Sequence, residues 1–121
     1  MEEQIKNARI TAVRISLDRG IFLCPRIYLE GAGWGVSFGG LICNKRGSDP
    51  TPLLGFFMMR VLETLDLEAW EDLPGKLIRT KSEGIGGRCL EIGHPIENKW
   101  FAISELKELA NETLRQSDTE C

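Results

Sequence analysis

The sequence lacks several features that would assign it to a familiar class of protein. Acidic residues outnumber basic ones, 18 to 15, for a net charge of −3, which argues against the basic surface that nonspecific nucleic-acid binding needs. No apolar run approaches the roughly 20 residues of a membrane span. The N-terminal residues 1–6 are polar and include two acids, unlike a secretory signal. We therefore expect a cytosolic protein with no membrane partner and no nucleic-acid partner.

Residues for metal binding and nucleophilic catalysis are also few. The four cysteines, at positions 24, 43, 89 and 121, form no CxxC pair, so free thiols are expected. The only histidine, His94, lies five residues after Cys89, and strand alternation would put these two side chains on opposite faces. Neither the dinucleotide-binding motif GxGxxG nor the phosphate-loop motif GxxxxGK(S/T) is present. We predict no catalytic residue, no metal site and no cofactor; an enzyme using His94 and nearby acids is the least favoured alternative.

What the chain does have is an unusual glycine-rich segment at residues 31–40, GAGWGVSFGG. Glycine weakens a strand because its backbone loses more entropy on ordering and it offers no side chain to pack. Five glycines so close together indicate either a bent, bulged strand or a surface on which a ligand or partner lies. The residues of this candidate surface are Gly31, Gly33, Trp34, Gly35, Phe38, Gly39 and Gly40.

Hydrophobic patterning predicts one α+β domain over residues 1–121, with ends that fray at 1–8 and 117–121. Alternating side chains predict a meander of three antiparallel strands between residues 13 and 43, with a bulge at Gly39–Gly40. Pro25 lacks a backbone donor, so its strand is expected to be at an edge or bulged there. Cys24, Cys43 and Cys89 fall in apolar strand patterns, and we expect them to be core residues.

The second half of the chain completes the predicted fold. Thr51 and Pro52 read as an N-cap and a first helical residue, followed by apolar residues at helical spacing. Residues 76–81 and 89–92 predict a β-hairpin, and Ser104 is expected to cap a final helix. The predicted order is βββ–α–ββ–α, an antiparallel sheet with both helices packed on one face.

The first predicted helix also supplies a candidate protein interface. Phe56 and Met59 lie off its main apolar stripe, beside Glu63, and exposed apolar side chains of this kind mark binding surfaces. Homodimerisation through this helix is the simplest use of such a surface. The acids at positions 63–72 read either as a solvated face or as a surface that fits a basic groove.

Three stretches, taken in order, resemble small proteins encoded by tailed bacteriophages and prophages. They are Gly33-Trp34-Gly35 through Phe38-Gly39-Gly40, then Arg60-Val61-Leu62-Glu63 through Trp70-Glu71-Asp72-Leu73-Pro74-Gly75-Lys76, then Ile92-Gly93-His94-Pro95-Ile96 through Lys99-Trp100-Phe101. The resemblance covers roughly residues 10–104. It implies a phage or prophage origin and a role in the host cytoplasm during infection, and it brings no catalytic residue with it.

Two functions from different classes follow. The first is a non-enzymatic accessory protein that binds a host or phage protein, or a second copy of itself; inhibition of a bacterial defence system is one such role. The alternative is a small-ligand or nucleotide-binding protein that uses the hairpin at Gly31–Gly40. The sequence does not name the partner.

Overall fold

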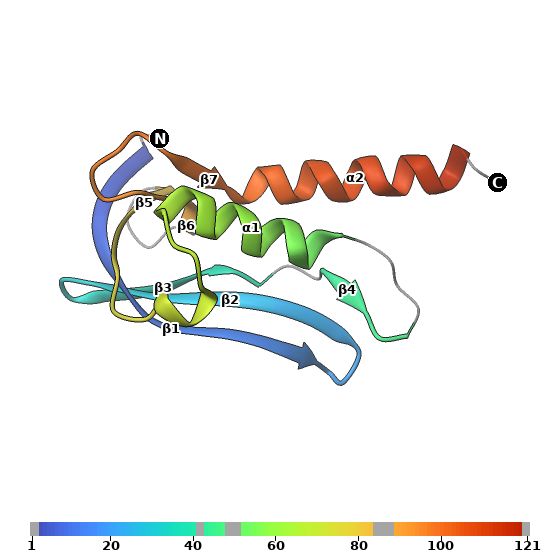
Figure 1. The fold of residues 1–121 in the computed structure, drawn as a ribbon, viewed down its shortest axis with the longest axis horizontal. Coiled ribbons are helices and arrows are strands. Elements are labelled where there is room, and N and C mark those ends of the chain that lie inside the picture. The colour runs from blue at the N-terminus through green and yellow to red at the C-terminus, as the bar shows by residue number, and fades with distance from the viewer. Residues whose placement is uncertain (1–2, 41–42, 48–51, 84–88, 120–121) are drawn as a thin grey trace.

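In the computed structural model, residues 3–40, 43–47, 52–83 and 89–119 are described, and these form an antiparallel sheet with helices on one face (Figure 1). The elements are β1 (Glu3–Asp18), β2 (Phe22–Gly31), β3 (Trp34–Gly39), β4 (Asn44–Lys45), α1 (Leu53–Leu65), the 3-10 helix η1 (Trp70–Asp72), β5 (Leu77–Glu83), β6 (Cys89–Gly93), β7 (Trp100–Ala102) and α2 (Ile103–Thr119). The strands lie in the order β3-β2-β1-β5-β6-β7, and β4 also pairs with β2. The predicted α+β class and order βββ–α–ββ–α are confirmed, and β4 and β7 are short additions.

The long strand β1 joins two halves of the sheet. Its residues 3–9 pair with β5, and residues 9–18 pair with β2. The register shifts between Ile10 and Ala12, where a bulge bends the strand. The expectation that residues 1–8 fray is therefore wrong for residues 3–8, because pairing with β5 orders a polar segment that has no strong strand signal of its own.

The core lies on the helix-covered face, inside a curled sheet. The sheet bends far enough for β3, at one edge, to contact β6 near the other. Three fully buried rings meet there. The ring centroid of Phe38 in β3 lies 5.8 Å from that of Phe57 in α1 and 5.6 Å from that of Phe101 in β7. Cys24, Cys43 and Cys89 are buried free thiols, which confirms their prediction as core residues; Cys121 lies outside the described residues.

The predicted bulge at the glycine pair is present and explains Pro25. Strand β3 ends at Gly39, which lies opposite Arg26, and β4 resumes the pairing at Asn44 opposite Leu23. Between these two pairs, the chain advances five residues from Gly39 to Asn44 but only three residues along β2, from Leu23 to Arg26. Gly40 donates its amide to the carbonyl of Pro25 (2.7 Å), and the missing amide of Pro25 falls at this break in the ladder. Of the two predicted alternatives, the structure has the bulge rather than an edge.

The helix ends differ from the sequence prediction by one or two residues. Pro52 is the N-cap of α1 rather than its first residue, and Thr51 lies outside the described residues. Helix α2 begins at Ile103, so Ser104 is inside it. The Glu105 carboxylate instead accepts the Ala102 amide (3.0 Å), the half of a capping box that a carboxylate supplies. Residues 117–119, expected to fray, are within α2. No helix in the described ranges is both long and apolar enough to cross a bilayer.

An ion pair closes the far end of the β1–β2 hairpin. Both terminal N–H groups of Arg26 donate hydrogen bonds to the Asp18 carboxylate, and the Ser16 hydroxyl donates to the same carboxylate (2.8 Å). The Arg26 guanidinium, with help from Ser16, holds the pKa of Asp18 well below its usual range. The pair fixes the outer face of the hairpin next to its turn.

This ion pair predicts an acid-sensitive contribution to stability. Because the pKa of Asp18 is lower in the folded protein than its ordinary 3.8, the contribution is present above about pH 4 and is lost as the pH falls further. Urea unfolding of wild type and Asp18→Asn should therefore differ at pH 6 and converge towards pH 2. A difference that stays constant over this range would contradict the assignment.

Candidate functional site

The structure explains four of the five glycines of the candidate ligand surface by the fold itself. A Cβ at Gly31 would overlap the Trp34 ring, Gly33 has φ +76° in the β2–β3 turn, and Gly39 (φ +100°) and Gly40 (φ +82°) form the bulge. Gly35 has no such constraint, because a Cβ there would meet only ordinary contacts, the nearest at 3.6 Å. Trp34 is half-buried and Phe38 is fully buried. These residues thus form a bent hairpin.

One shallow hollow lies beside Gly35 on the outer face of the sheet. It measures about 540 Å³, and its lining includes Thr11, Tyr28, Glu30, Gly35 and Ser37. It is wide and open to solvent rather than enclosed. This hollow is where the alternative small-ligand hypothesis would place its ligand.

The candidate interface on α1 is smaller than the sequence suggests. Phe56 is half-buried, and its ring packs edge-to-face with that of Phe101, with the ring centroids 6.3 Å apart. Met59 is 61% exposed and Glu63 is exposed. The surface that α1 offers here is therefore one exposed thioether beside a carboxylate.

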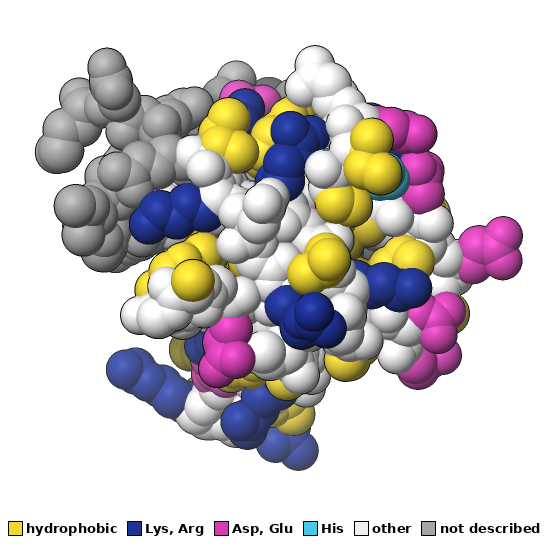
Figure 2. All heavy atoms as spheres, turned by 90° about the vertical axis from the view of Figure 1, so that its left-hand side faces the viewer, with side chains coloured by type: hydrophobic (Ala, Val, Ile, Leu, Met, Phe, Trp, Pro, Cys, Tyr) yellow, Lys and Arg dark blue, Asp and Glu magenta, His cyan; other side chains and the backbone are white. Residues whose placement is uncertain are grey.

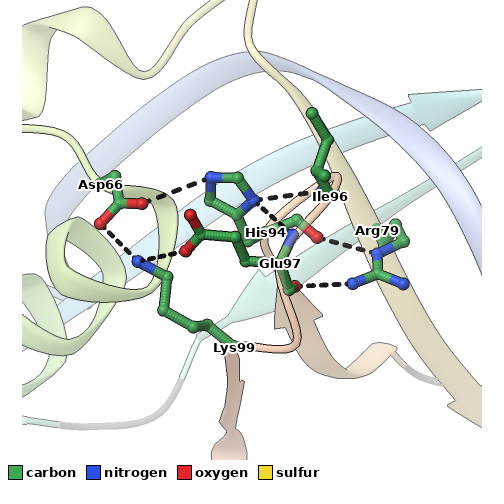
Figure 3. A network of polar contacts seen from close by, with 6 residues as sticks. All are labelled: Asp66, Arg79, His94, Ile96, Glu97 and Lys99. Atoms are coloured by element: carbon green, nitrogen blue, oxygen red, sulfur yellow. Dashed lines mark hydrogen bonds and ion pairs between the residues drawn. The ribbon is translucent and has the colours of Figure 1, made fainter.

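The most elaborate polar arrangement in the described structure surrounds the loop between β6 and β7, residues 94–99 (the 94–99 loop, Figure 3). The loop is closed by a hydrogen bond from the His94 amide to the Lys99 carbonyl (3.0 Å). From the neighbouring strand β5, Arg79 donates to the carbonyls of His94 and Glu97, both at 2.8 Å. From the end of α1, Asp66 contacts the side chains of His94 and Lys99. Two elements distant in sequence, α1 and β5, thus hold one short loop.

His94 is the centre of this network. Its Nδ1 accepts the amides of Ile96 (3.1 Å) and Glu97 (2.9 Å), so the proton of a neutral ring lies on Nε2. That Nε2 faces Asp66 Oδ2 at 3.4 Å, and the side chain is only 15% exposed. The ring therefore acts as a bridge between the loop backbone and the C-terminal end of α1.

Asp66 is positioned for this contact by the way α1 ends. Its backbone is left-handed (φ +55°, ψ +44°) and stops the helix, a conformation that aspartate adopts more readily than most residues. Lys99 bonds to its carboxylate and, at 3.2 Å, to that of Glu97. The bond from Lys99 is the main cause of a lowered pKa of Asp66.

The donor chemistry of the cluster suits a structural brace better than a metal site. Among the described residues, only Asp66, His94 and Glu97 bring three potential ligand atoms within 4.8 Å of one another, and no cysteine joins them. A metal ion at Nε2 would need a free lone pair on that nitrogen. Because Nδ1 accepts two amides, the ring proton occupies Nε2 instead. The Lys99 ammonium already bonds to both carboxylates.

The buried thiols are equally unsuited to nucleophilic chemistry. Burial raises the pKa of Cys43 and that of Cys89 to about 12, so both are protonated at neutral pH. The His94 ring is held by the loop, because its Nδ1 accepts the amides of Ile96 and Glu97. Cys43, Cys89 and His94 are therefore each accounted for by burial or by contacts within the fold.

The braced loop presents one large aliphatic side chain to solvent. Ile96, near its tip, is 86% exposed, the highest value among the large hydrophobic residues described. In the sequence, Ile96 stands within the third stretch that resembles phage proteins, and no role was predicted for it. The available signal was its position, since it is the one large aliphatic residue in the segment from Gly93 to Lys99.

The chain has no match among the family models, the curated proteins or the solved structures with which it was compared.

Proposed function

We propose that the protein acts by binding another protein, with the 94–99 loop as its recognition element and Ile96 as its anchor. The observation that carries the proposal is the exposure of Ile96 on a loop that six side-chain and backbone contacts hold in place. Single exposed aliphatic residues are common on protein surfaces. On the 94–99 loop, ordering that binding normally requires is already present in the free protein.

Apolar anchors that enter a pocket on a partner carry much of the free energy of protein association. A stiff loop presents such an anchor with little loss of conformational entropy on binding. The resemblance to phage proteins supports a host or phage protein as the partner, in the host cytoplasm, and inhibition of a defence system is a role that fits a small non-enzymatic binder.

A photo-crosslinking amino acid placed at position 96 tests the proposal in the bacterial host. We expect a covalent adduct of defined mass from position 96 and none from the matched position Met59, the exposed apolar residue on α1. The crosslinked band should disappear when unlabelled wild-type protein competes, and survive competition by Ile96→Asp. An adduct from position 59 alone would move the interface to α1, and equal competition by Ile96→Asp would contradict the role of Ile96.

A further inference from the structure

We propose that a second copy of this chain also binds the 94–99 loop, in a head-to-tail contact with the turn end of the β1–β2 hairpin. The inference rests on the proposed function in that Ile96 is the anchor in both. It adds the complementary surface, which lies on the same chain.

The turn end of the hairpin exposes three large aliphatic side chains. Ile15 is 37% exposed, Leu17 is 50% exposed and Ile21, in the turn, is 42% exposed. Ile15 and Leu17 project from the same face of β1, opposite Pro25 and Leu23 of β2. This apolar surface, residues 15, 17 and 21, belongs to the half of the sheet farthest from the 94–99 loop.

Two exposed arginines lie at the turn beside this apolar surface. They are Arg19, in the turn itself, and Arg46, which is held against the turn by bonds to the carbonyls of Gly20 and Ile21. The nearby Asp18 is paired with Arg26, so it does not offset them. The hairpin end is apolar with a basic rim.

The 94–99 loop has the opposite rim. Glu97 and Asp66, with side chains 57% and 52% exposed, are shared by one cation, Lys99. Exposed acids continue at Glu63 and Glu68, on either side of Asp66. Figure 2 shows magenta acidic side chains gathered beside the single histidine, which is drawn in cyan, with hydrophobic side chains next to them. Acidic and basic rims around apolar centres give the electrostatic complementarity that selects and orients partners.

The two surfaces lie at opposite ends of the molecule. In β1, Asn7 pairs with Arg79, which holds the 94–99 loop, whereas Asp18 ends the strand at the hairpin turn. Figure 1 shows the two ends of β1 far apart. The surfaces therefore cannot meet within one chain. Each copy has one of each, so the contact is heterologous and repeats into rings or open chains.

Sedimentation velocity at low salt tests the contact with two complementary variants, Ile96→Asp and Leu17→Asp. Wild type should form assemblies that grow with concentration at 0.03 M salt and dissociate in 0.5 M salt, where the Debye length is roughly four times shorter. Each variant alone should be monomeric, because it lacks one of the two surfaces. An equimolar mixture should form a dimer and nothing larger, since one intact loop and one intact hairpin remain. Met59→Asp, the matched control, should assemble like wild type.

Circular dichroism and thermal melting of each variant confirm that monomers are folded. Monomeric wild type at high concentration and low salt would overturn the self-association, and crosslinking of another protein at position 96 would then still support the proposed function. A closed two-fold dimer that Leu17→Asp leaves intact would overturn the head-to-tail geometry. Growth of the variant mixture beyond a dimer would do the same.

Discussion

Replacing Gly39 with alanine is expected to lower the free energy of unfolding by about 2–4 kcal/mol. Two causes act together. The backbone has φ +100°, which L-residues rarely adopt, and a Cβ would lie 2.7 Å from the Pro25 carbonyl oxygen and 3.1 Å from the Phe57 ring. Neither neighbour can move freely, because the first is strand backbone and the second is a fully buried ring. Urea unfolding measures the change.

The matched control is Gly35→Ala in the same strand. Here a Cβ meets only ordinary contacts, and alanine is favoured over glycine in a strand by about 0.5–1 kcal/mol. We expect this variant to be as stable as wild type or more stable. Similar losses at both positions would contradict the account of the bulge, since the two glycines would then be needed for the same reason.

Much of the fold could be predicted because its signals are local. Alternation marked the second half of β1 and strand β3, helical spacing marked α1, and the glycine pair at 39–40 marked the bulge. Each of these follows from a few neighbouring residues, whatever the rest of the chain does. The same holds for the buried cysteines, which lie in apolar strand patterns.

The parts that were missed depend on partners far away in sequence. Residues 3–8 are polar at most positions and become a strand only through pairing with β5, 70 to 80 residues later. Asp66 reads as one acid among several, and its contact with Lys99 joins residues 33 positions apart. The exposure of Ile96 could not be read from periodicity, because a short loop has none.

The bracing role of His94 predicts opposite outcomes for two substitutions. In His94→Asn, the side-chain oxygen can take the place of Nδ1 and accept the amides of Ile96 and Glu97. In His94→Gln, the polar atoms lie one bond farther out, nearer the position of Nε2. Exchange of these two amides with solvent should therefore quicken roughly tenfold in His94→Gln and change little in His94→Asn. The Cys43 amide, bonded to the Leu23 carbonyl, serves as the internal reference.

The most direct test of the central claim is the hydrogen exchange of the Ile96 and Glu97 amides in wild-type protein, followed by NMR. A recognition loop that is ordered before binding should protect both amides, although Ile96 and Glu97 are exposed at the surface. We predict protection that is lost in His94→Gln while the fold persists. Exchange as fast as in an unstructured peptide would contradict the claim, because Ile96 would then project from a loop that nothing holds.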